Sequence, residues 1–240
     1  KKSNNNFTLF KDNLFFRNIT FQNFQILKMI SFLVRDKNWN NYDAKILNFE
    51  ENLDSNLKYI FDLEYGVNEI FKTRNTILFS KNSITLSSKG KFFTDFWTNR
   101  IGFNLLIPLA NHVSSNIIVT KEGGEILETK FPELIKPNQP FYKFKNLSYI
   151  LDSSLLVNIN FEGILFEMED QRNWGDASYK IYSGSLLDPF PYLEKKDSKF
   201  SQNIRIDVSI KKERSFSSNN VAKLDETTSY KFPKIGIKID

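Results

Sequence analysis

Residues 57–65 read LKYIFDLEY, with large apolar side chains at every second position and mostly polar residues between them. A repeat of two is the spacing of a β-strand, whose successive side chains point to opposite faces of a sheet. The stretch therefore predicts a strand with one buried face and one face toward solvent.

The same spacing recurs outward from this stretch, at residues 157–161 and 204–210. No segment keeps the apolar spacing of a helix over a dozen residues. Many short strands without alternating helices predict an all-β, antiparallel sandwich. Shorter runs rich in β-branched and aromatic residues add further candidate strands, at Phe7–Phe10, Leu14–Phe21, Gln25–Val34, Thr76–Ser80, Ile84–Ser87 and Ile117–Thr120.

The two ends of the chain differ from this pattern. Lys1–Asn6 and Lys211–Thr228 are polar and weakly patterned, so we expect them to be flexible. Beyond them, Ile235, Ile237 and Ile239 again alternate like a strand, which suggests that more of the protein follows. We expect residues 1–240 to form a single β-rich domain.

Composition excludes several classes of site. The 240 residues contain no cysteine and one histidine, so thiolate metal sites, cysteine nucleophiles and multi-histidine metal sites are excluded. Nucleotide-phosphate motifs are also absent, and we expect neither a metal nor a cofactor. The net charge is +5, but the lysines are scattered among acidic residues, which argues against nucleic-acid binding. No apolar stretch is long enough to cross a membrane, and the first residues, KKSNNNFTLF, do not have the apolar core of a signal peptide, so we expect a cytoplasmic protein.

The three tryptophans, Trp39, Trp97 and Trp174, each stand in a segment that also contains arginine, aspartate and asparagine. We name residues 34–39, 95–100 and 169–176 the tryptophan segments. Indole faces stack on the C–H faces of sugars, while arginine forks, amides and carboxylates bind hydroxyl groups. The segments therefore fit two interpretations equally well. One is a shared sugar site, and the other is that each segment is a buried ion pair that braces a loop beneath a core tryptophan.

Other titratable groups leave more than one interpretation open. His112 follows an apolar run and could act as a general base, although an ordinary hydrogen-bonded histidine is the favoured interpretation. Glu167, Glu169, Asp170 and Asp176 form a carboxylate group in the sequence. They could act as acid and base, bind hydroxyls, or pair with Arg172 and Lys180.

The third tryptophan segment lies in a block, residues 166–182, that reads FEMEDQRNWGDASYKIY. It resembles the FEMEDQRNWTDASFKTY block of the D-apionate lactonase family. Three further blocks are similar to that family in the same order: residues 30–39 to I-x-FLVRDxxW, residues 98–103 to TNRxGF, and residues 131–141 to FPxLIxPxQPF. The resemblance covers most of the chain from Ile30 onward.

The resemblance implies a fold and a reaction. Proteins of the family have a β-rich N-terminal region followed by a (β/α)-barrel, and this chain corresponds to the first region. The implied fold is an antiparallel sandwich, with the galactose-mutarotase-like supersandwich as one form of it. The implied activity is hydrolysis of a branched sugar-acid lactone, which makes a small sugar lactone the expected ligand. The alternative is a non-catalytic carbohydrate-binding or scaffolding domain that supports a separate catalytic barrel. The protein partners that we consider are a C-terminal barrel domain and further copies of the chain in a homo-oligomer.

One departure concerns a histidine. Where the family has Leu-His-Pro, this chain has Leu106-Ile107-Pro108. If the family's histidine is catalytic, either no residue takes that role in this chain or His112 does.

Lactone hydrolysis needs a base and a group that stabilises the oxyanion. We expect Arg172 or Arg100 to bind the oxyanion or the carboxylate product, and Asp170 or Asp176 to be the base. The stacking walls are expected to be Trp39 and Trp174. The remaining expected substrate-binding residues are Arg35, Asp36, Asn99, Glu169, Asn173, Lys180 and His112.

Overall fold

The computed structural model describes residues 1–240 except 5, 68, 153 and 211–240. The expectations for Lys211–Thr228 and for the isoleucines after it lie outside the described residues. Every strand pairing within the described part is antiparallel, which confirms the all-β prediction. The strands are β1 (Lys2–Ser3), β2 (Phe7–Asp12), β3 (Phe15–Phe21), β4 (Phe24–Asp36), β5 (Ala44–Asn52), β6 (Leu57–Tyr65), β7 (Phe71–Phe79), β8 (Ser83–Phe92), β9 (Phe96–Pro108), β10 (Asn116–Lys121), β11 (Ile126–Lys130), β12 (Phe141–Leu151), β13 (Leu155–Glu162), β14 (Phe166–Asp170), β15 (Ser178–Ser183), β16 (Tyr192–Glu194) and β17 (Lys199–Ile210).

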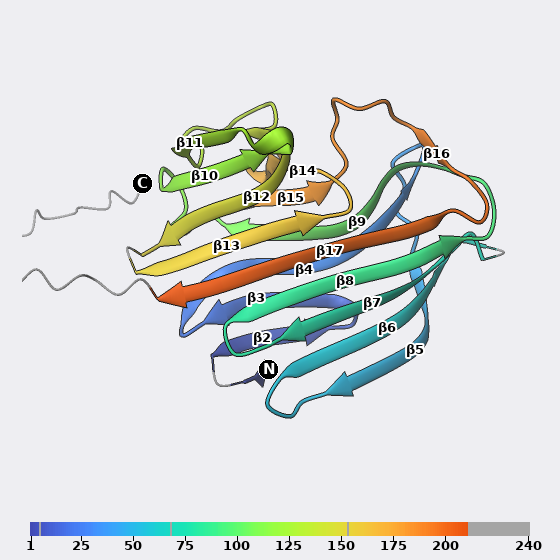
Figure 1. The fold of residues 1–240 in the computed structure, drawn as a ribbon, viewed down its shortest axis with the longest axis horizontal. Helices are drawn as coiled ribbons and strands as arrows, with labels where there is room; N and C mark the ends of the chain where they lie inside the picture. The colour runs from blue at the N-terminus through green and yellow to red at the C-terminus, as the bar shows by residue number, and fades with distance from the viewer. Residues whose placement is uncertain (5, 68, 153, 211–240) are drawn as a thin grey trace, which may run out of the picture.

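The strands form one curled sheet that folds into two layers (Figure 1). The first layer runs β5-β6-β7-β8-β17-β13-β12-β10-β11. The second runs β1-β2-β3-β4-β9-β15-β14, with β16 also paired to β9. Strand β12 joins them, because Phe141 and Phe144 pair with β14 while its later residues pair with β10 and β13.

The core lies between the two layers, where the inward side chains of alternating strands meet. The five apolar residues of β6 from Leu57 to Tyr65 that the sequence places on one face are all buried. Tyr59 packs edge-on against Phe16 of β3, with ring centroids 4.8 Å apart. Phe79 of β7 packs in the same way against Phe7 of β2, at 5.8 Å. The aromatic-rich composition is thus used to fill the space between the layers.

The N-terminus and strand β9 both differ from the sequence-based expectations. Lys2 and Ser3 form the short strand β1 and pair with β2, so the prediction of a flexible N-terminus was wrong for these two residues. Asn4 holds them in place, since its side chain accepts from the Phe7 N–H and donates to the Phe79 carbonyl. Strand β9 was not predicted from the sequence. It is buried on both faces over most of its length, so its sequence does not alternate between apolar and polar residues.

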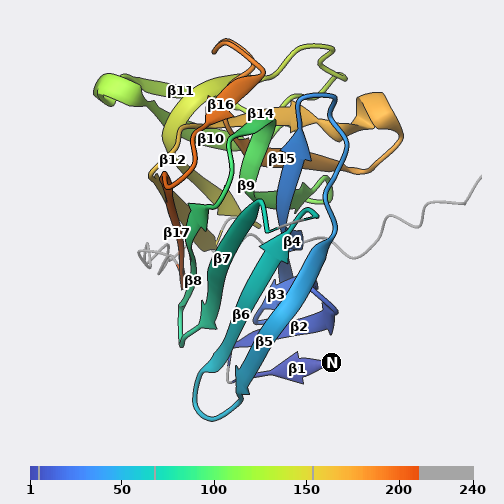
Figure 2. The ribbon, with the colours of Figure 1, turned by 90° about the vertical axis from the view of Figure 1, so that its right-hand side faces the viewer.

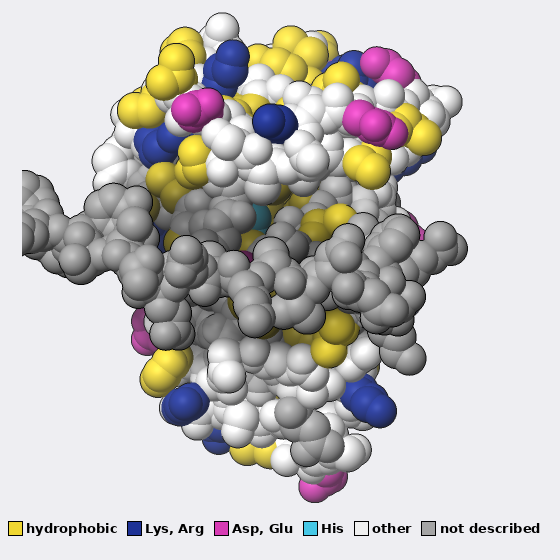
Figure 3. All heavy atoms as spheres, turned by 90° about the vertical axis from the view of Figure 1, so that its left-hand side faces the viewer, with side chains coloured by type: hydrophobic (Ala, Val, Ile, Leu, Met, Phe, Trp, Pro, Cys, Tyr) yellow, Lys and Arg dark blue, Asp and Glu magenta, His cyan; other side chains and the backbone are white. Residues whose placement is uncertain are grey.

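The two helical elements in the described part are the short 3-10 helices η1 (Glu122–Gly124) and η2 (Gln171–Trp174). Among the described residues, no helix is long and apolar enough to cross a membrane. On the face shown in Figure 3, basic and acidic side chains are interspersed over the visible surface.

Candidate active site

A cleft of about 500 Å³ is lined by residues from the end of β4, the start of β9 and the segment in which η2 connects β14 to β15. Figure 2 shows the end of β4 on the same side of the molecule as β14 and β15. All three tryptophan segments contribute side chains to the cleft. The residues that line it are Arg35, Trp39, Arg100, Glu169, Gln171, Trp174, Lys180, Tyr182 and Leu186.

Strand alternation explains why the charged residues gather here. Each one adjoins a core residue in the sequence: Val34 precedes Arg35, and Ile101 follows Arg100. Because neighbouring side chains on a strand point to opposite faces, the charged residues lie on the side of the second layer away from the core. Register then brings them together, since Arg35 is directly opposite Arg100, and Glu169 is directly opposite Lys180.

The loop that carries Trp39 is held by two residues that the sequence assigned to substrate binding. The Asp36 carboxylate accepts hydrogen bonds from the backbone N–H groups of Asn38 and Asn40, at 2.8 and 2.9 Å. The Asn99 side chain donates to the Lys37 carbonyl at 2.9 Å. Neither Asp36 nor Asn99 lines the cleft. Their predicted contact with substrate stays a prediction, whereas their contacts in the structure position Trp39.

Asp170, Arg172 and Asn173 form a second brace. Asp170 is 0% exposed, and its carboxylate accepts from Arg172 Nε at 2.9 Å and Nη2 at 2.7 Å. The same guanidinium donates to the carbonyl groups of residues 132–134, and Asn173 donates to the carbonyl of Lys136. Burial opposes ionisation of Asp170, but the bonds from Arg172 outweigh it and hold the pKa of the carboxyl below its usual value. These contacts fasten residues 132–136 to the end of β14, and none of the three side chains lines the cleft.

Asp176 and Trp97 also lie outside the lining. Asp176 forms an ion pair with Lys28 and accepts from the Ser178 hydroxyl. Burial opposes its ionisation, but these partners outweigh that effect and hold its pKa below the usual value. Trp97 is half exposed on β9. The second tryptophan segment therefore reaches the cleft through Arg100 and not through its indole.

His112 is fully buried away from the cleft. Its Nδ1 donates to the Ala110 carbonyl at 3.0 Å, and its ring packs edge-on against Phe131 and Tyr149. Burial lowers its pKa to about 4, so the ring is neutral at neutral pH. This geometry agrees with the favoured interpretation of an ordinary hydrogen-bonded histidine, and its predicted contact with substrate stays a prediction.

Inside the cleft, Glu169 is the acidic residue of the lining. Its carboxylate accepts from Trp174 Nε1 at 3.0 Å and from Lys180 Nζ at 2.8 Å. Burial opposes its ionisation, but the Lys180 hydrogen bond and charge outweigh this and keep its pKa below the usual value. Arg100 stacks on the ring of Tyr182, with its guanidinium carbon 3.5 Å from the ring centroid. Burial is the main cause that lowers the pKa of Arg100.

Sequence reasoning missed three residues of the lining, Gln171, Tyr182 and Leu186. Tyr182 could have been found, because it is two residues from Lys180 on a strand and so shares its face. Behind it, Glu167 is fully buried and accepts from the Tyr182 hydroxyl, from Ser185 Oγ at 2.7 Å and from the Leu186 N–H at 2.9 Å. Glu167 therefore fixes two members of the cleft wall.

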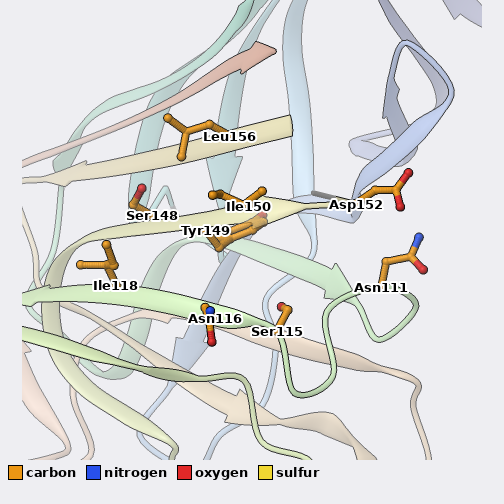
Figure 4. A pocket seen from close by; sticks show the side chains of 9 residues that line it. All are labelled: Asn111, Ser115, Asn116, Ile118, Ser148, Tyr149, Ile150, Asp152 and Leu156. Carbon is orange, nitrogen blue, oxygen red and sulfur yellow. The ribbon is translucent and has the colours of Figure 1, made fainter. Parts of the chain in front are cut away.

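A metal site and a second hollow are the other candidates for a functional site. The described residues hold no group of three or more acidic, histidine or cysteine residues arranged to bind a metal ion. A second hollow of about 580 Å³ lies over β10, β12 and β13 (Figure 4). Its lining mixes small polar side chains with Ile118, Ile150 and Leu156, and Asp152 is its single ionisable side chain apart from the Tyr149 phenol. Of these two hollows, the first cleft combines indole faces, cations and a carboxylate, and the second does not.

Comparison with known proteins identifies the family of this chain. A family model described as D-apionate lactonase, N-terminal domain, matches residues 4–211. A D-apionate lactonase from Brucella anthropi is 32% identical over 232 residues, which are 93% of this chain and 38% of the relative. The chain therefore spans less than two-fifths of the length of that relative.

Solved structures resemble the fold. A galactose mutarotase-like protein from Lactobacillus casei superposes with a TM-score of 0.57 over 87% of this chain and 99% of its own, at 5% identity. A β-arabinopyranosidase matches with a TM-score of 0.55 over 85% of this chain and 38% of its own, at 7% identity. At such low identity these matches bear on fold alone, and they confirm the expected galactose-mutarotase-like form of the sandwich.

Proposed function

The chain belongs to the D-apionate lactonase N-terminal domain family, and from this we propose that its cleft serves the hydrolysis of a branched sugar-acid lactone in carbohydrate catabolism. The reaction would be of the D-apionolactone to D-apionate type. The observation that carries the proposal is that Arg100 and Glu169 line one cleft together with the indoles of Trp39 and Trp174. The resemblance of sequence blocks and the 32% identity to a D-apionate lactonase support the choice of substrate.

The indoles supply walls for the sugar ring. Trp174 is 75% exposed, and its indole nitrogen is fixed by Glu169, so its orientation is set while its face stays available. Trp39 has a positive φ of 69° in a loop held by Asp36 and Asn99. Such rings contribute large contact areas to apolar C–H faces and lose little conformational freedom on binding.

The charged groups would divide the chemistry between them. Glu169 would take a proton from water as the water oxygen attacks the lactone carbonyl carbon. Arg100 and Lys180 would stabilise the oxyanion of the tetrahedral intermediate. The bond between the carbonyl carbon and the ring oxygen then breaks, and the leaving oxygen takes the proton back from Glu169. The products are a carboxylic acid, which ionises, and a free hydroxyl group.

This assignment favours Glu169 over the bases that the sequence suggested. Asp170 is enclosed by Arg172 and backbone N–H groups, and Asp176 is paired with Lys28 and Ser178. All three carboxyls have a lowered pKa and are therefore ionised at neutral pH, but of the three only Glu169 lines the cleft. Arg100 is likewise favoured over Arg172, whose donors are already used by Asp170 and three carbonyl groups.

A second function has an observation in its favour. The chain spans only 38% of the length of the B. anthropi lactonase, so the groups that complete the reaction could belong to the remainder of such a protein. In that case the domain would bind the sugar without converting it, and would support a separate catalytic barrel.

The test is an assay of D-apionolactone hydrolysis by the 240-residue chain, with the longer B. anthropi relative as the positive control. We expect turnover by the chain, and a loss of about 100-fold in kcat for Glu169→Gln, as is typical when a general base is removed. Arg205→Met, in an exposed pair with Asp207 on β17, is the matched control and should leave turnover unchanged.

Each outcome decides between the two functions. Binding of the lactone by the chain without turnover, beside an active relative, would favour the non-catalytic domain. Turnover that survives Glu169→Gln would remove Glu169 from the mechanism. The absence of both binding and turnover would contradict the proposed substrate.

A further inference from the structure

The cleft contains more positive than negative charge. Arg35, Arg100 and Lys180 line it, and Glu169 is the one carboxylate among its lining residues. Arg35 and Arg100 are directly opposite each other on β4 and β9, an arrangement in which like charges are destabilising. Within the part of the chain that the structure describes, neither arginine has an acidic partner within ion-pairing distance. Glu169 and the buried Glu167 act on Arg100 through their charge, but neither forms an ion pair with either arginine.

Arg100 is the more unusual of the two. It is only 5% exposed, and its Nε has no hydrogen-bond partner among the described residues. A buried cation is costly unless it is paired and hydrogen-bonded. The ring of Tyr182 beneath it fixes the plane of the guanidinium, and Glu167 in turn fixes the Tyr182 hydroxyl. Arg100 is therefore held in one orientation, with donor capacity left over.

Lys180 is also affected by the positive charge of its neighbours. Burial lowers its pKa, and although Glu169 opposes this, the charges of Arg100 and Arg35 lower it further. Glu169 is thus shared among several cations and does not neutralise them. An anion bound between Arg100 and Lys180 would relieve the repulsion and satisfy the free donors at once.

We propose that this cleft binds the carboxylate of a ring-opened polyhydroxy acid in its ground state, and binds it more tightly than the neutral lactone or the corresponding amide. The identity of the acid as D-apionate rests on the proposed function, whereas the preference for a carboxylate rests on the three cations. One consequence is that the acid competes with the lactone, so that hydrolysis is inhibited by its own product.

The lining favours a sugar acid over an inorganic anion. Each Glu169 oxygen already accepts one hydrogen bond and has a lone pair left, which can accept from a ligand hydroxyl. A phosphate dianion in the same cleft would bring a larger negative charge toward Glu169 than a carboxylate does, and it has no polyol hydroxyl groups to donate to the Glu169 oxygens. The two indoles offer walls to a carbon chain and nothing to a compact ion.

The test measures binding by titration calorimetry and by thermal unfolding of the 240-residue chain, with D-apionate, D-apionamide and inorganic phosphate as probes. The amide keeps the polyol and removes only the charge. We expect D-apionate to bind about 10- to 100-fold more tightly than the amide, as for hydrogen bonds to a charged group. At 100 times its Kd it should raise the Tm by about 5–10 °C.

Variants connect the preference to named residues. Arg100→Met should weaken D-apionate binding by about 10- to 100-fold and leave amide binding nearly unchanged. Arg35→Met removes the less buried cation of the same pair and should likewise weaken D-apionate binding more than amide binding. This second variant keeps the test possible if Arg100→Met does not fold. Arg205→Met is the control and should change neither affinity.

Equal binding of the acid and the amide, or no binding of the acid, would overturn the inference. Phosphate binding as tight as that of D-apionate would also overturn it, because it would show a general anion site. These outcomes are separate from the proposed function. A chain that prefers the acid but does not hydrolyse the lactone supports the inference alone, and a chain that hydrolyses the lactone without this preference supports the proposed function alone.

Discussion

Arg172 and Arg100 show how differently one residue type is used in this fold. Arg172 donates to a buried carboxylate and to three carbonyl groups, so each nitrogen of its guanidinium already has an acceptor within the protein. Arg100 stacks on Tyr182 and keeps free donors. The sequence places both in similar segments, yet their partners assign one to bracing and the other to the cleft.

The brace leads to a prediction about stability. Arg172→Met leaves the Asp170 carboxylate buried without its partner, and breaking such a pair costs about 3 kcal/mol or more. We therefore expect the free energy of unfolding in urea to fall by that amount. Arg205→Met removes an arginine from an exposed pair and should change it by no more than about 0.5 kcal/mol. Equal effects of the two substitutions would contradict the role of Arg172 as a brace.

His112 leads to a prediction about pH, because it is the one histidine of the chain. Its folded pKa of about 4 lies below the ordinary value of 6.5, so the unfolded chain binds the proton more readily. The stabilisation is complete above the unfolded pKa and is lost as the pH falls toward 4. Between pH 7 and pH 5 we expect the free energy of unfolding to decrease by about 2 kcal/mol.

Urea unfolding at a series of pH values checks this expectation, with His112→Gln as the comparison. In that variant the slope between pH 7 and pH 5 should nearly vanish, since no other side chain has an ordinary pKa in this window. A slope that persists in His112→Gln would assign the pH dependence to another group.

At the scale of elements, β9 connects the core to the cleft. It pairs with β4 along most of its length, and with β15 and β16 at its two ends. Arg100 near its start faces the cleft, whereas residues such as Ile101 and Phe103 belong to the core. Displacement of this strand would therefore disturb the packing of the core and the position of the buried cation together.

Gly102 provides the test of this element. Its φ is +138°, a value that side chains rarely adopt, and a Cβ built there would lie 2.3 Å from Ser183 Oγ and 2.6 Å from Gln202 Nε2. We expect Gly102→Ala to lower the free energy of unfolding by about 3 kcal/mol or more, as the sum of backbone strain and overpacking.

Gly123→Ala is the matched control for this substitution. Gly123 also has a positive φ, of +85°, but nothing lies within 4 Å of its built Cβ. It should therefore cost only the strain, about 1 kcal/mol. If urea unfolding gives the same loss for both glycines, the close approach at Gly102 does not constrain β9.

At the scale of the whole molecule, the curled sheet creates the site. Residues 35, 100 and 169–182 are far apart in the sequence, and they meet because β4, β9, β15 and β14 are consecutive neighbours in one layer. The core occupies the other face of this layer, so the charged face is free to form a cleft. The chain spans 38% of the length of the B. anthropi relative.

The sequence alone determined the all-β class, because alternation such as that of residues 57–65 reports directly which face of a strand is buried. It also identified the three tryptophan segments. It could not say which of their residues face the cleft, since neighbouring side chains point in opposite directions and their partners are distant in the chain. Only the tertiary structure shows that Asp170 and Arg172 form hydrogen bonds with residues 132–136. It also shows that Arg100 lies opposite Arg35 and that its Nε has no hydrogen-bond partner among the described residues. The physical reason is that strand register and loop packing, which depend on the whole fold, decide which buried polar groups find a partner.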